Sequence, residues 1–440
     1  MKKTMKKAIS VTISSVLSLS LLAGCGGAPA VSSSMNSQNS ASASEIVSDG
    51  KQYEGVKLVY WVGQEATVPF GVTVTEAAKA FEEATGAEVQ LEFKGNKGIP
   101  ETFVASYDAG QQIDIIDGVQ NKSAYGDRLI CLEDLVKQAD YEKNTNPALM
   151  AQARSYWEDG KLYEIPYTSN YTGYMYNKAL FKQAGVDKVP ATQEEFLEVC
   201  QKLKDAGITP LTTDDAYAPQ AFGYHLARLL GQEGVLEVVH NGEWDKPEVL
   251  QTAQFFEELA SNGYFSSQVG SNVWPTGQNT EFGASTVAMY CVPTFVVNEL
   301  KTIVNDDFEW GYFAYPEVDG GINGLETVTI TASTMAITSR CENPEAAFAL
   351  IEWITRGEWD AKIAQECITV PMDITNEYWP EELIDVKPYA SSITNYQIQC
   401  GGVQDNADIL PSLKENLIKL YAGTCTAEDF VANMMAAANA

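Results

Sequence analysis

Histidine is nearly absent from this chain, and this scarcity limits the chemistry that the chain can perform. The 440 residues include only His225 and His240, which lie fifteen positions apart without a neighbouring cysteine pair. A histidine-based catalytic triad or a zinc centre is hard to build from so few imidazoles, although sites made of carboxylates alone stay open. We therefore expect no metal and no cofactor.

The sequence also lacks the loops that bind nucleotides. It contains no G-x-x-x-x-G-K-[ST] loop and no G-x-G-x-x-G after a strand. Because such loops supply the backbone N–H groups that hold phosphates, the chain itself is expected neither to hydrolyse ATP nor to bind a dinucleotide. Its 59 acidic residues could supply a carboxylate pair for glycoside hydrolysis, but a sequence cannot show such a pair at the required separation.

Cysteine is present, but without the spacing of a metal site or a disulfide framework. One of the eight cysteines is Cys25, near the N-terminus, and no two of them form a C-x-x-C pair. The other seven are an odd number at wide intervals, which argues against a disulfide framework. We expect most of them to be small buried hydrophobic side chains. They are Cys131, Cys200, Cys291, Cys341, Cys367, Cys400 and Cys425.

Basic residues are outnumbered two to one by acidic residues. The chain has 29 Lys and Arg against 59 Asp and Glu, a net charge of −30. Cleavage after residue 24 would remove four lysines and no acid, and the charge would become −34. A surface this acidic repels nucleic acid and anionic lipid, and we therefore expect neither as a partner. The charge does not by itself identify a positively charged ligand, because acidic surfaces often serve solubility alone.

The N-terminus has the pattern of a secretory signal. It reads MKKTMKKAISVTISSVLSLSLLAGCGG, with four lysines before an apolar stretch from Ala8 to Ala23 that serines interrupt. This stretch is too short and too polar to be a convincing membrane-spanning helix. We predict a signal peptide over residues 1–24.

The last residues of the signal, Leu22-Ala23-Gly24-Cys25, resemble the bacterial lipobox. The resemblance implies that cleavage leaves Cys25 as a lipidated N-terminus, and two acyl chains hold a protein stably at a membrane. Residues 26–50 are mostly Ser, Ala, Gly, Asn and Gln, so we predict a flexible tether over 25–52. The expected location is the extracytoplasmic face of a bacterial cell membrane.

The folded part begins with a strand, a helix and a second strand. KLVYWVG (57–63) is a short run of aromatic and β-branched residues, typical of a buried strand. Thr75 is a suitable N-cap for EAAKAFEEAT, Gly86 would end that helix, and AEVQLEF alternates as a strand. This βαβ order predicts a parallel sheet with helices on its faces.

The alternation continues along the chain. We expect a helix near 99–109, a strand at IDIIDG, and helices capped by Asn177 and Thr192, the latter in a capping box with Glu195. A further helix is expected to start at Asn343-Pro344, and residues Thr426 to Asp429 are expected to open a terminal helix. The chain is therefore predicted to be α/β throughout with no internal membrane span. Its length predicts two domains or two lobes.

Five tyrosines crowd the segment DGKLYEIPYTSNYTGYMYNKALF (159–181). The first three recur every four residues, but Pro166 removes a helical donor and Gly173 weakens a helix, so no single helix can run through the segment. YMY (174–176) is predicted to be a strand that ends at Asn177. Tyr174 and Tyr176 would share one face of it and belong to the core.

The order of segments resembles that of extracellular solute-binding proteins of ABC transporters, in the sugar-binding group that includes the maltose-binding proteins. The similar segments are DAGQQIDIIDG, GKLYEIPY followed by YMYNKALFKQAG, PATQEEFLEVCQKLKDAGITPL, FGASTVAMYCVPTF, FEWGYFAYPEV and NPEAAFALIEWIT. KLVYWVG and the helix after it match the family's first strand and helix, and the resemblance as a whole covers roughly residues 53 to 440. The chain departs from the family pattern at Ile113, where proline is usual, at Ser285, where glycine is usual, and at Pro293-Thr294-Phe295, where Gly-Ser-Trp is common.

The resemblance implies a periplasmic-binding-protein-like α/β fold, with two α/β lobes joined by crossing hinge segments and a ligand cleft between them. Transferred here, lobe one comprises 53–167 plus 312–356, and lobe two comprises 168–311 plus 357–440. The expected hinges are IPYTSN (165–170), FEWGYF (308–313) and TRGEWD (355–360). The resemblance also implies a monomer that is not an enzyme, binds a carbohydrate by lobe closure and delivers it to ABC permease subunits in the membrane.

Candidate ligand-binding residues follow from the chemistry of sugars and from the expected position of the cleft. Aromatic faces suit the C–H patches of a sugar, and amides and carboxylates suit its hydroxyls. Open α/β sheets place ligands at the ends of their strands. The candidates after the first and third strands are Trp61, Gln64, Glu65, Asp117, Gln120 and Asn121, with a core tryptophan and ordinary loop residues as the alternative.

The other candidates lie on the crossing segment and on later loops. Trp274 stands in the polar loop SNVWPTGQN, where an aromatic side chain has little structural purpose. Phe295 takes the place of the family's stacking tryptophan, with a second core aromatic as the alternative. These candidates are Tyr167, Asn170, Tyr171, Tyr217, Trp274, Thr294, Phe295 and Tyr396.

Two alternatives to sugar import stay open on the sequence. One is a secreted, lipid-anchored glycoside hydrolase, which needs two carboxylates in one pocket. The other keeps the binding fold but changes the cargo to an amine, a peptide or ferric iron.

Overall fold

The structure is a computed structural model that describes residues 52–118, 125–305 and 307–440. Its compact unit spans Asp49–Ala440. The predicted signal peptide, the lipidation residue Cys25, residues 26–51 of the predicted tether and the candidates Gln120 and Asn121 lie outside the described residues.

The first strands form the predicted parallel sheet. β1 (Lys57–Val62) lies between β2 (Glu88–Phe93) and β3 (Ile115–Asp117), and it is parallel to both. Five of its six residues are buried, as expected of an apolar run with helices on its faces. The connections are α1 (Pro69–Thr85) and α2 (Gly95–Asp108).

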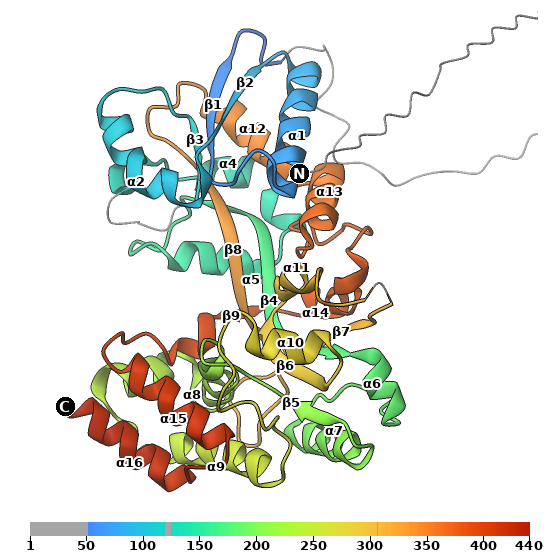
Figure 1. The fold of residues 1–440 in the computed structure, drawn as a ribbon. Coiled ribbons are helices and arrows are strands. Elements are labelled where there is room, and N and C mark those ends of the chain that lie inside the picture. The colour runs from blue at the N-terminus through green and yellow to red at the C-terminus, as the bar shows by residue number, and fades with distance from the viewer. Residues whose placement is uncertain (1–51, 119–124, 306) are drawn as a thin grey trace, which may run out of the picture. The chain divides into compact units, whose positions relative to one another are not determined.

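Two long antiparallel strands run side by side through the middle of the compact unit (Figure 1). They are β4 (Ile165–Asn177) and β8 (Thr327–Ile337), paired from Ile165 opposite Met335 to Tyr171 opposite Ile330. On one side β8 pairs with β3, and on the other β4 pairs with β6 (Val287–Pro293), which lies parallel to β5 (Thr209–Leu211). β7 (Trp310–Phe313) also pairs with β4, and β9 (Asn395–Gln397) pairs with β8.

Separate hydrophobic cores lie at the two ends of these strands. At one end, Ile165, Met335 and Ile337 pack with β1, α1 and α12 (Pro344–Ile354), and a smaller cluster forms around Trp61 and Phe103. At the other end, the larger core includes Tyr171, Val328 and Ile330. The helices that cover it are α7 (Gln193–Asp205), α8 (Ala218–Asn241), α9 (Pro247–Ser261), α15 (Leu410–Tyr421) and α16 (Ala427–Ala438).

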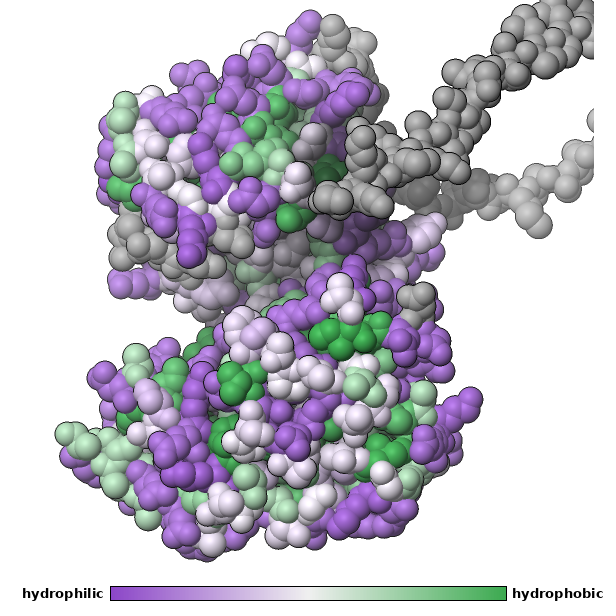
Figure 2. Space-filling view, in the orientation of Figure 1, coloured by the Kyte–Doolittle hydropathy of each residue, from purple (hydrophilic) through white to green (hydrophobic). Residues whose placement is uncertain are grey.

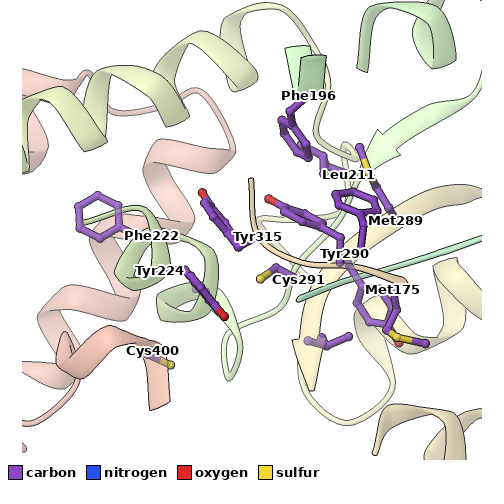
Figure 3. Packing of buried hydrophobic residues seen from close by; sticks show 14 of the residues in the cluster. Met175, Phe196, Leu211, Phe222, Tyr224, Met289, Tyr290, Cys291, Tyr315 and Cys400 are labelled. Atoms are coloured by element: carbon purple, nitrogen blue, oxygen red, sulfur yellow. The ribbon is translucent and has the colours of Figure 1, made fainter. Parts of the chain in front are cut away.

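Aromatic rings fill much of the larger core. Tyr224 and Tyr315 stack with ring centroids 4.8 Å apart and an interplanar angle of 8°, beside Cys291 and Tyr290 of β6 (Figure 3). His225 belongs to the same core, because it stacks on Phe255 at 4.5 Å. Burial lowers the pKa of His225 to about 3, so its imidazole is a neutral core side chain.

Short elements complete the fold. They are η1 (Gly126–Arg128), α4 (Glu133–Gln138), η2 (Tyr141–Asn144), α5 (Pro147–Ser155), α6 (Lys178–Gln183), α10 (Gly277–Gly283), α11 (Val296–Leu300), α13 (Gly357–Cys367), η3 (Glu381–Val386), α14 (Lys387–Ala390) and η4 (Gln399–Gly402). The surface face in Figure 2 is largely hydrophilic, with hydrophobic residues scattered over it. In the described parts of the chain, no helix combines the length and the apolar character that a membrane span requires.

The tyrosine-rich segment is one strand, in agreement with the exclusion of a helix. Tyr174 and Tyr176 are core residues, as predicted, and their rings lie 5.1 Å and 5.7 Å from the ring of Phe313. Pro166 coincides with an irregularity in the pairing of β4 with β8, which is where a residue without an N–H is tolerated.

The residue limits of the two lobes stay a prediction, and the packing of the cores favours limits that differ from those expected. Tyr312, Tyr315 and Val328 pack in the larger core. In contrast, α13 packs against α1 and α12. We therefore propose that β4 and β8 are crossings between lobes, and that lobe one includes α13 while residues 312–330 belong to lobe two.

Candidate functional site

Asp117, at the end of β3, is the centre of a buried hydrogen-bond network. Its Oδ1 accepts from the Tyr60 hydroxyl at 2.5 Å, and its Oδ2 accepts from Gly63 N at 2.9 Å and from the Tyr167 hydroxyl at 3.3 Å. Burial raises the pKa of Asp117 to about 7, although these three hydrogen bonds favour the ionised form. The carboxyl group thus connects β1, β3 and β4.

The other candidates of the first lobe differ in their exposure. Trp61 is buried between Phe103 and Lys94. Its ring centroid lies 6.4 Å from that of Phe103, in edge contact, and 3.9 Å from Lys94 Nζ. Trp61 is therefore a core residue, which was the alternative to a ligand contact on the sequence. Gln64 is half-buried and hydrogen-bonds the Tyr167 side chain, whereas Glu65 is exposed. Gln64 and Glu65 therefore present polar groups beside the Asp117 network.

A second group forms where β4 meets the end of β6. The Thr294 hydroxyl donates to Asn170 Oδ1 at 3.1 Å and accepts from Tyr171 N at 3.3 Å, while Thr294 N donates to the Tyr171 carbonyl at 3.0 Å. Asn170 and the adjacent Phe295 are half-buried. The ring of Tyr171 is buried in the core, and this burial raises its pKa. Asn170, Thr294 and Phe295, chosen from different segments, are thus brought together.

A third group forms on the loop between β5 and α8. Asp214 is fully buried, and its Oδ1 accepts from Ala216 N and Tyr217 N, both at 3.0 Å. The next residue, Asp215, accepts from Trp274 N at 2.8 Å and so ties the Trp274 loop to the Tyr217 loop. Tyr217 is half-buried and Trp274 is 48% exposed. These two aromatic candidates therefore lie on connected loops.

Sequence reasoning missed the acids that hold this third group together. Glu281 accepts from Thr212 Oγ1 at 2.6 Å, from Asn272 Nδ2 at 2.7 Å and from Ser266. Asp214 and Asp215 stood beside the chosen Tyr217 in the segment DDAYAP, and an acidic residue shortly before a helix is a recognisable capping signal.

Tyr396 lies apart from these groups on β9, which pairs with β8. It is half-buried. Burial raises the pKa of the nearby Tyr156 to about 12, with smaller contributions from Glu164 and Tyr396. Glu164 accepts from the Thr334 hydroxyl at 2.6 Å. Tyr396 thus belongs to the surroundings of the two long strands.

Two internal cavities of the described residues are too small to hold a sugar. One is lined by Tyr174, His225 and Phe255 and encloses about 10 Å³, and the other is lined by Thr213, Tyr217 and others and encloses about 20 Å³. Each is about the size of one water molecule. A solute larger than a water molecule fits neither of them, whereas the partly exposed groups combine aromatic rings, amides and carboxylates. These groups suit non-covalent recognition of a polyhydroxylated molecule. Among the described residues, no cluster of three His, Cys, Asp or Glu side chains could hold a metal ion.

Known proteins with similar sequences are binding proteins. The chain is 34% identical over 212 residues to a multiple sugar-binding protein of Streptococcus mutans, covering 46% of this chain and 49% of that protein. It is 27% identical over 205 residues to the diacetylchitobiose binding protein of Streptomyces coelicolor, covering 44% of this chain and 45% of that protein. The chain thus spans about half the length of the curated relatives it matches.

Solved structures and the family profile agree on the fold. A secreted solute-binding lipoprotein of Streptomyces coelicolor superimposes with a TM-score of 0.70 at 17% identity, covering 87% of this chain and 98% of that one. At this identity the match shows the fold alone, and it confirms the predicted periplasmic-binding-protein-like α/β class. The sequence profile of the bacterial extracellular solute-binding proteins matches residues 76–372. The chain therefore belongs to the bacterial extracellular solute-binding proteins, a family whose members bind their solutes and do not transform them.

Proposed function

We propose that this protein captures a sugar or oligosaccharide outside the cytoplasm and delivers it to the permease subunits of an ABC importer. The main support is that candidates from distant segments are brought together: the loops of Tyr217 and Trp274 are joined through Asp215, and Asn170 hydrogen-bonds Thr294, which precedes Phe295. Aromatic faces and hydrogen-bonding side chains together are what a sugar requires. The names of the two relatives, a multiple sugar-binding protein and a diacetylchitobiose binding protein, support the same class of cargo.

The proposed mechanism is closure of the two lobes on the solute. A solute favours the closed form only through contacts that it does not make with one lobe alone. The candidates Gln64 and Glu65 follow β1, whereas Tyr217, Trp274 and Phe295 lie on segments attached to the larger core. A solute that contacts both sets would hold the lobes together, with β4 and β8 bending between them. The closed form would be the one that the permease recognises.

A lipid anchor at Cys25 would keep the loaded protein at the membrane, where the permease is. The anchor is tested by Cys25→Ala. We expect the variant to lose labelling by a fatty acid and to appear in the culture medium, while the unchanged protein stays in the membrane fraction. Equal retention of the two proteins would contradict the anchor.

The cargo class is tested by a thermal-shift screen against monosaccharides, oligosaccharides, polyamines, peptides and ferric complexes. A ligand that binds the native state raises the unfolding midpoint, by an amount that grows with the logarithm of its concentration relative to Kd. We expect at least one sugar to raise the midpoint and the ferric complexes and peptides to leave it unchanged. Stabilisation by polyamines, peptides or ferric complexes with no response to any sugar would overturn the proposal.

A further inference from the structure

Asp214 is fully buried, yet half of its carboxylate has no partner. Oδ1 accepts from Ala216 N and Tyr217 N and so caps the start of α8, whereas Oδ2 has no hydrogen-bond donor. A buried charged oxygen without a donor is costly, and most such atoms in folded proteins have a partner. Beside the candidate Tyr217, the structure therefore holds a buried acceptor to which the described chain donates no hydrogen bond.

The charged groups that face Asp214 are acidic. Its pKa is raised to about 6, mainly by burial, with further contributions from Asp215 and Glu299. Asp214 and Glu299 in turn raise the pKa of the hydroxyls of Tyr217 and Tyr290, in addition to the effect of burial. The charged residues that raise the pKa of Asp214 are thus both acidic.

The second acid is held by hydrogen bonds from a neighbouring helix. Tyr290 donates its hydroxyl to Asn279 Oδ1 at 3.3 Å, and Asn279 Nδ2 donates to Glu299 Oε2 at 2.9 Å. Glu299 lies on α11 four residues after Phe295, so the two share one side of that short helix. Asp214 and Glu299 are thus fixed in a region that also includes the candidate aromatic residues Tyr217 and Phe295.

Unpartnered amides occur on the elements that carry this region. Gln220, in the first turn of α8, is buried, and its Nε2 has no partner. Gln278 precedes Asn279 on α10, and neither of its two amide atoms has a partner, although the side chain is also buried. Several buried polar groups on α8 and α10 are therefore left without partners near the start of α8 and around Asn279, as expected of a subsite that a polar ligand completes.

We propose that this region, with Asp214 at its centre and Glu299 and Tyr217 beside it, is a subsite for a protonated amino group, and that the cargo is an amino sugar or a short oligosaccharide with a free amine. This inference rests on the proposed function, because it names the class of sugar that the same site takes.

An ammonium group fits the subsite better than a hydroxyl does. A hydroxyl can donate one hydrogen bond to Asp214 Oδ2, but it leaves the charges of Asp214 and Glu299 uncompensated. Either donor makes a charge-assisted hydrogen bond to the carboxylate, but only the ammonium also brings the opposite charge that neutralises it. The faces of Tyr217 and the exposed Trp274 can attract the same cation.

The test compares three β-1,4-linked disaccharides of equal length by isothermal titration calorimetry with the full-length protein in detergent. They are the disaccharide of glucosamine, its doubly N-acetylated form and cellobiose. We expect the free amine to bind at least tenfold more tightly than the other two. Putrescine serves as a fourth ligand that has the amine without the sugar.

Asp214→Asn is the decisive variant, because it keeps the Oδ1 cap of α8 and replaces only the unpartnered oxygen by an NH₂ group. We expect it to abolish the preference for the amine. Asp215→Asn is the matched control, since it makes the same chemical change one residue away at an oxygen that already accepts from Trp274 N. It should keep the preference within about twofold. A thermal scan without ligand establishes that both variants are folded, and Glu299→Gln, expected to reduce the preference, replaces Asp214→Asn if that variant is not folded.

The outcomes separate this inference from the proposed function. If cellobiose or the acetylated disaccharide binds as tightly as the amine, or if Asp214→Asn leaves the preference unchanged, the amine subsite is wrong and sugar binding stands; in that case a water molecule satisfies Oδ2. If putrescine binds and no disaccharide does, the amine subsite stands and the sugar cargo is wrong. If none of the four binds, the amine subsite is wrong, and the thermal-shift screen decides the sugar cargo separately.

Discussion

At the scale of single residues, the exposure of Trp274 is unusual for its type. Tryptophan is among the side chains that are most buried on average, yet 48% of Trp274 is exposed. Its position is nevertheless fixed, because its backbone N–H donates to Asp215 at 2.8 Å. A large aromatic face that is held in place but left uncovered is suited to stacking on a sugar ring.

Replacement of Trp274 by Ala should weaken the responding sugar by about 1 kcal/mol or more, roughly a fivefold rise in Kd, because an aromatic anchor is lost from the site. Calorimetric titration measures this change. Tyr378→Ala is the matched control, since Tyr378 is a 69% exposed aromatic that is not among the candidates. An unchanged Kd in Trp274→Ala, or an equal loss in both variants, would remove Trp274 from the site.

Sequence reasoning placed residues at the site more easily than it assigned their partners. It selected Asp117 and Tyr167 separately, from the end of a strand and from the crossing segment. It could not show that both belong to one network with Tyr60, because Asp117 lies 57 residues after Tyr60 and 50 residues before Tyr167. For the same reason Trp61, which follows apolar neighbours in KLVYWV, could not be assigned between a core and a ligand position.

At the scale of helices and strands, the starts of helices were predicted well where a side chain caps them. Asn177 and Thr192 accept from Leu180 N and Glu195 N, as expected, and Thr426 forms a capping box with Asp429. The second half of the predicted capping box at Thr192 differs, because the Glu195 carboxylate accepts from Ala191 N at 2.7 Å. The start of α1 was wrong. This helix begins at Pro69, and Thr75 lies inside it with its hydroxyl donating to the Gly71 carbonyl at 2.7 Å. Proline at the first position starts a helix without a capping side chain.

Close packing of two elements leaves no room for a side chain at Gly223. This residue lies on α8 against η4, and a Cβ atom there would overlap the carbonyl oxygen of Cys400. We expect Gly223→Ala to lower the free energy of unfolding by about 2 kcal/mol, as overpacking of a tight contact does. Gly270→Ala is the control, because a Cβ atom there has its nearest neighbour, Ala422 Cβ, at 3.9 Å. Urea denaturation measures both, and equal midpoints would contradict the prediction.

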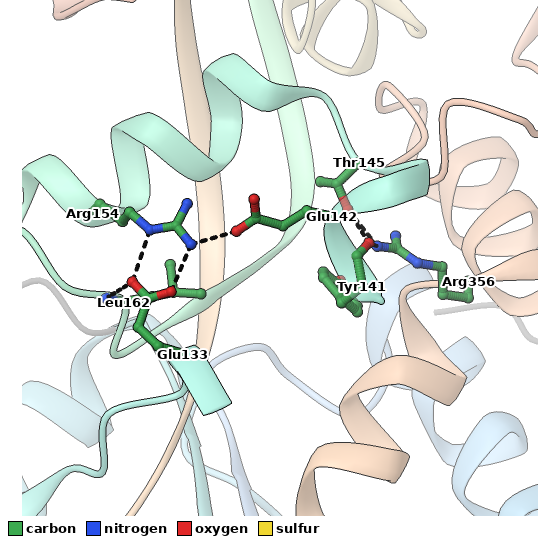
Figure 4. Close-up of polar contacts among 7 residues, drawn as sticks. All are labelled: Glu133, Tyr141, Glu142, Thr145, Arg154, Leu162 and Arg356. Carbon is green, nitrogen blue, oxygen red and sulfur yellow. Dashed lines mark hydrogen bonds and ion pairs between the residues drawn. The ribbon is translucent and has the colours of Figure 1, made fainter. Parts of the chain in front are cut away.

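Arg154 joins three elements that precede β4. Its guanidinium binds both carboxylate oxygens of Glu133 on α4 at 2.8 Å and also contacts Glu142 on η2, while Leu162 N donates to Glu133 at 3.1 Å (Figure 4). This bond with Arg154 is the main cause that lowers the pKa of Glu133. Nearby, Arg356 binds the Tyr141 carbonyl at 2.6 Å and covers the Tyr141 ring.

Arg154→Met should therefore destabilise the protein by about 1 kcal/mol, because a bidentate pair in a network is worth more than an isolated surface pair. The urea midpoint is the measurement. Lys419→Met breaks a single exposed pair with Glu415 on α15 and should leave the midpoint unchanged. If the two variants behave alike, the network adds nothing to stability.

At the scale of the whole molecule, the α/β class was predictable and the division into lobes was less so. The order of strands and helices, with apolar runs of β-branched and aromatic residues, predicted a sheet covered by helices, and each pattern is local. The division depends on which core a segment joins, and this is decided by contacts across the chain. Tyr312 and Val328 precede the end of β8 in sequence, yet they pack with helices that begin near residues 193 and 410.

Three buried aspartates should make the stability of the whole molecule depend on pH. Burial raises the pKa of Asp117 to about 7, of Asp360 to about 7 and of Asp214 to about 6. For an acid with a raised pKa in the folded state, stability is fully present below the unfolded pKa and is lost as the pH rises through the folded pKa. His225, with its pKa lowered to about 3, acts in the opposite direction below its usual pKa. Because three acids oppose one imidazole, the balance between pH 5.5 and 8 is a loss of stability.

We therefore expect the free energy of unfolding to be a few kcal/mol lower at pH 8 than at pH 5.5, since one pKa unit corresponds to about 1.4 kcal/mol. Urea denaturation at the two pH values measures the difference. Asp117→Asn should reduce it, because the amide can turn its oxygen to Gly63 N and its nitrogen to the Tyr60 hydroxyl without a charge. Asp319→Asn, at an exposed carboxylate, should leave it unchanged. A protein that is equally stable at both pH values, or an equal effect of the two variants, would mean that the buried carboxyl groups do not control this dependence.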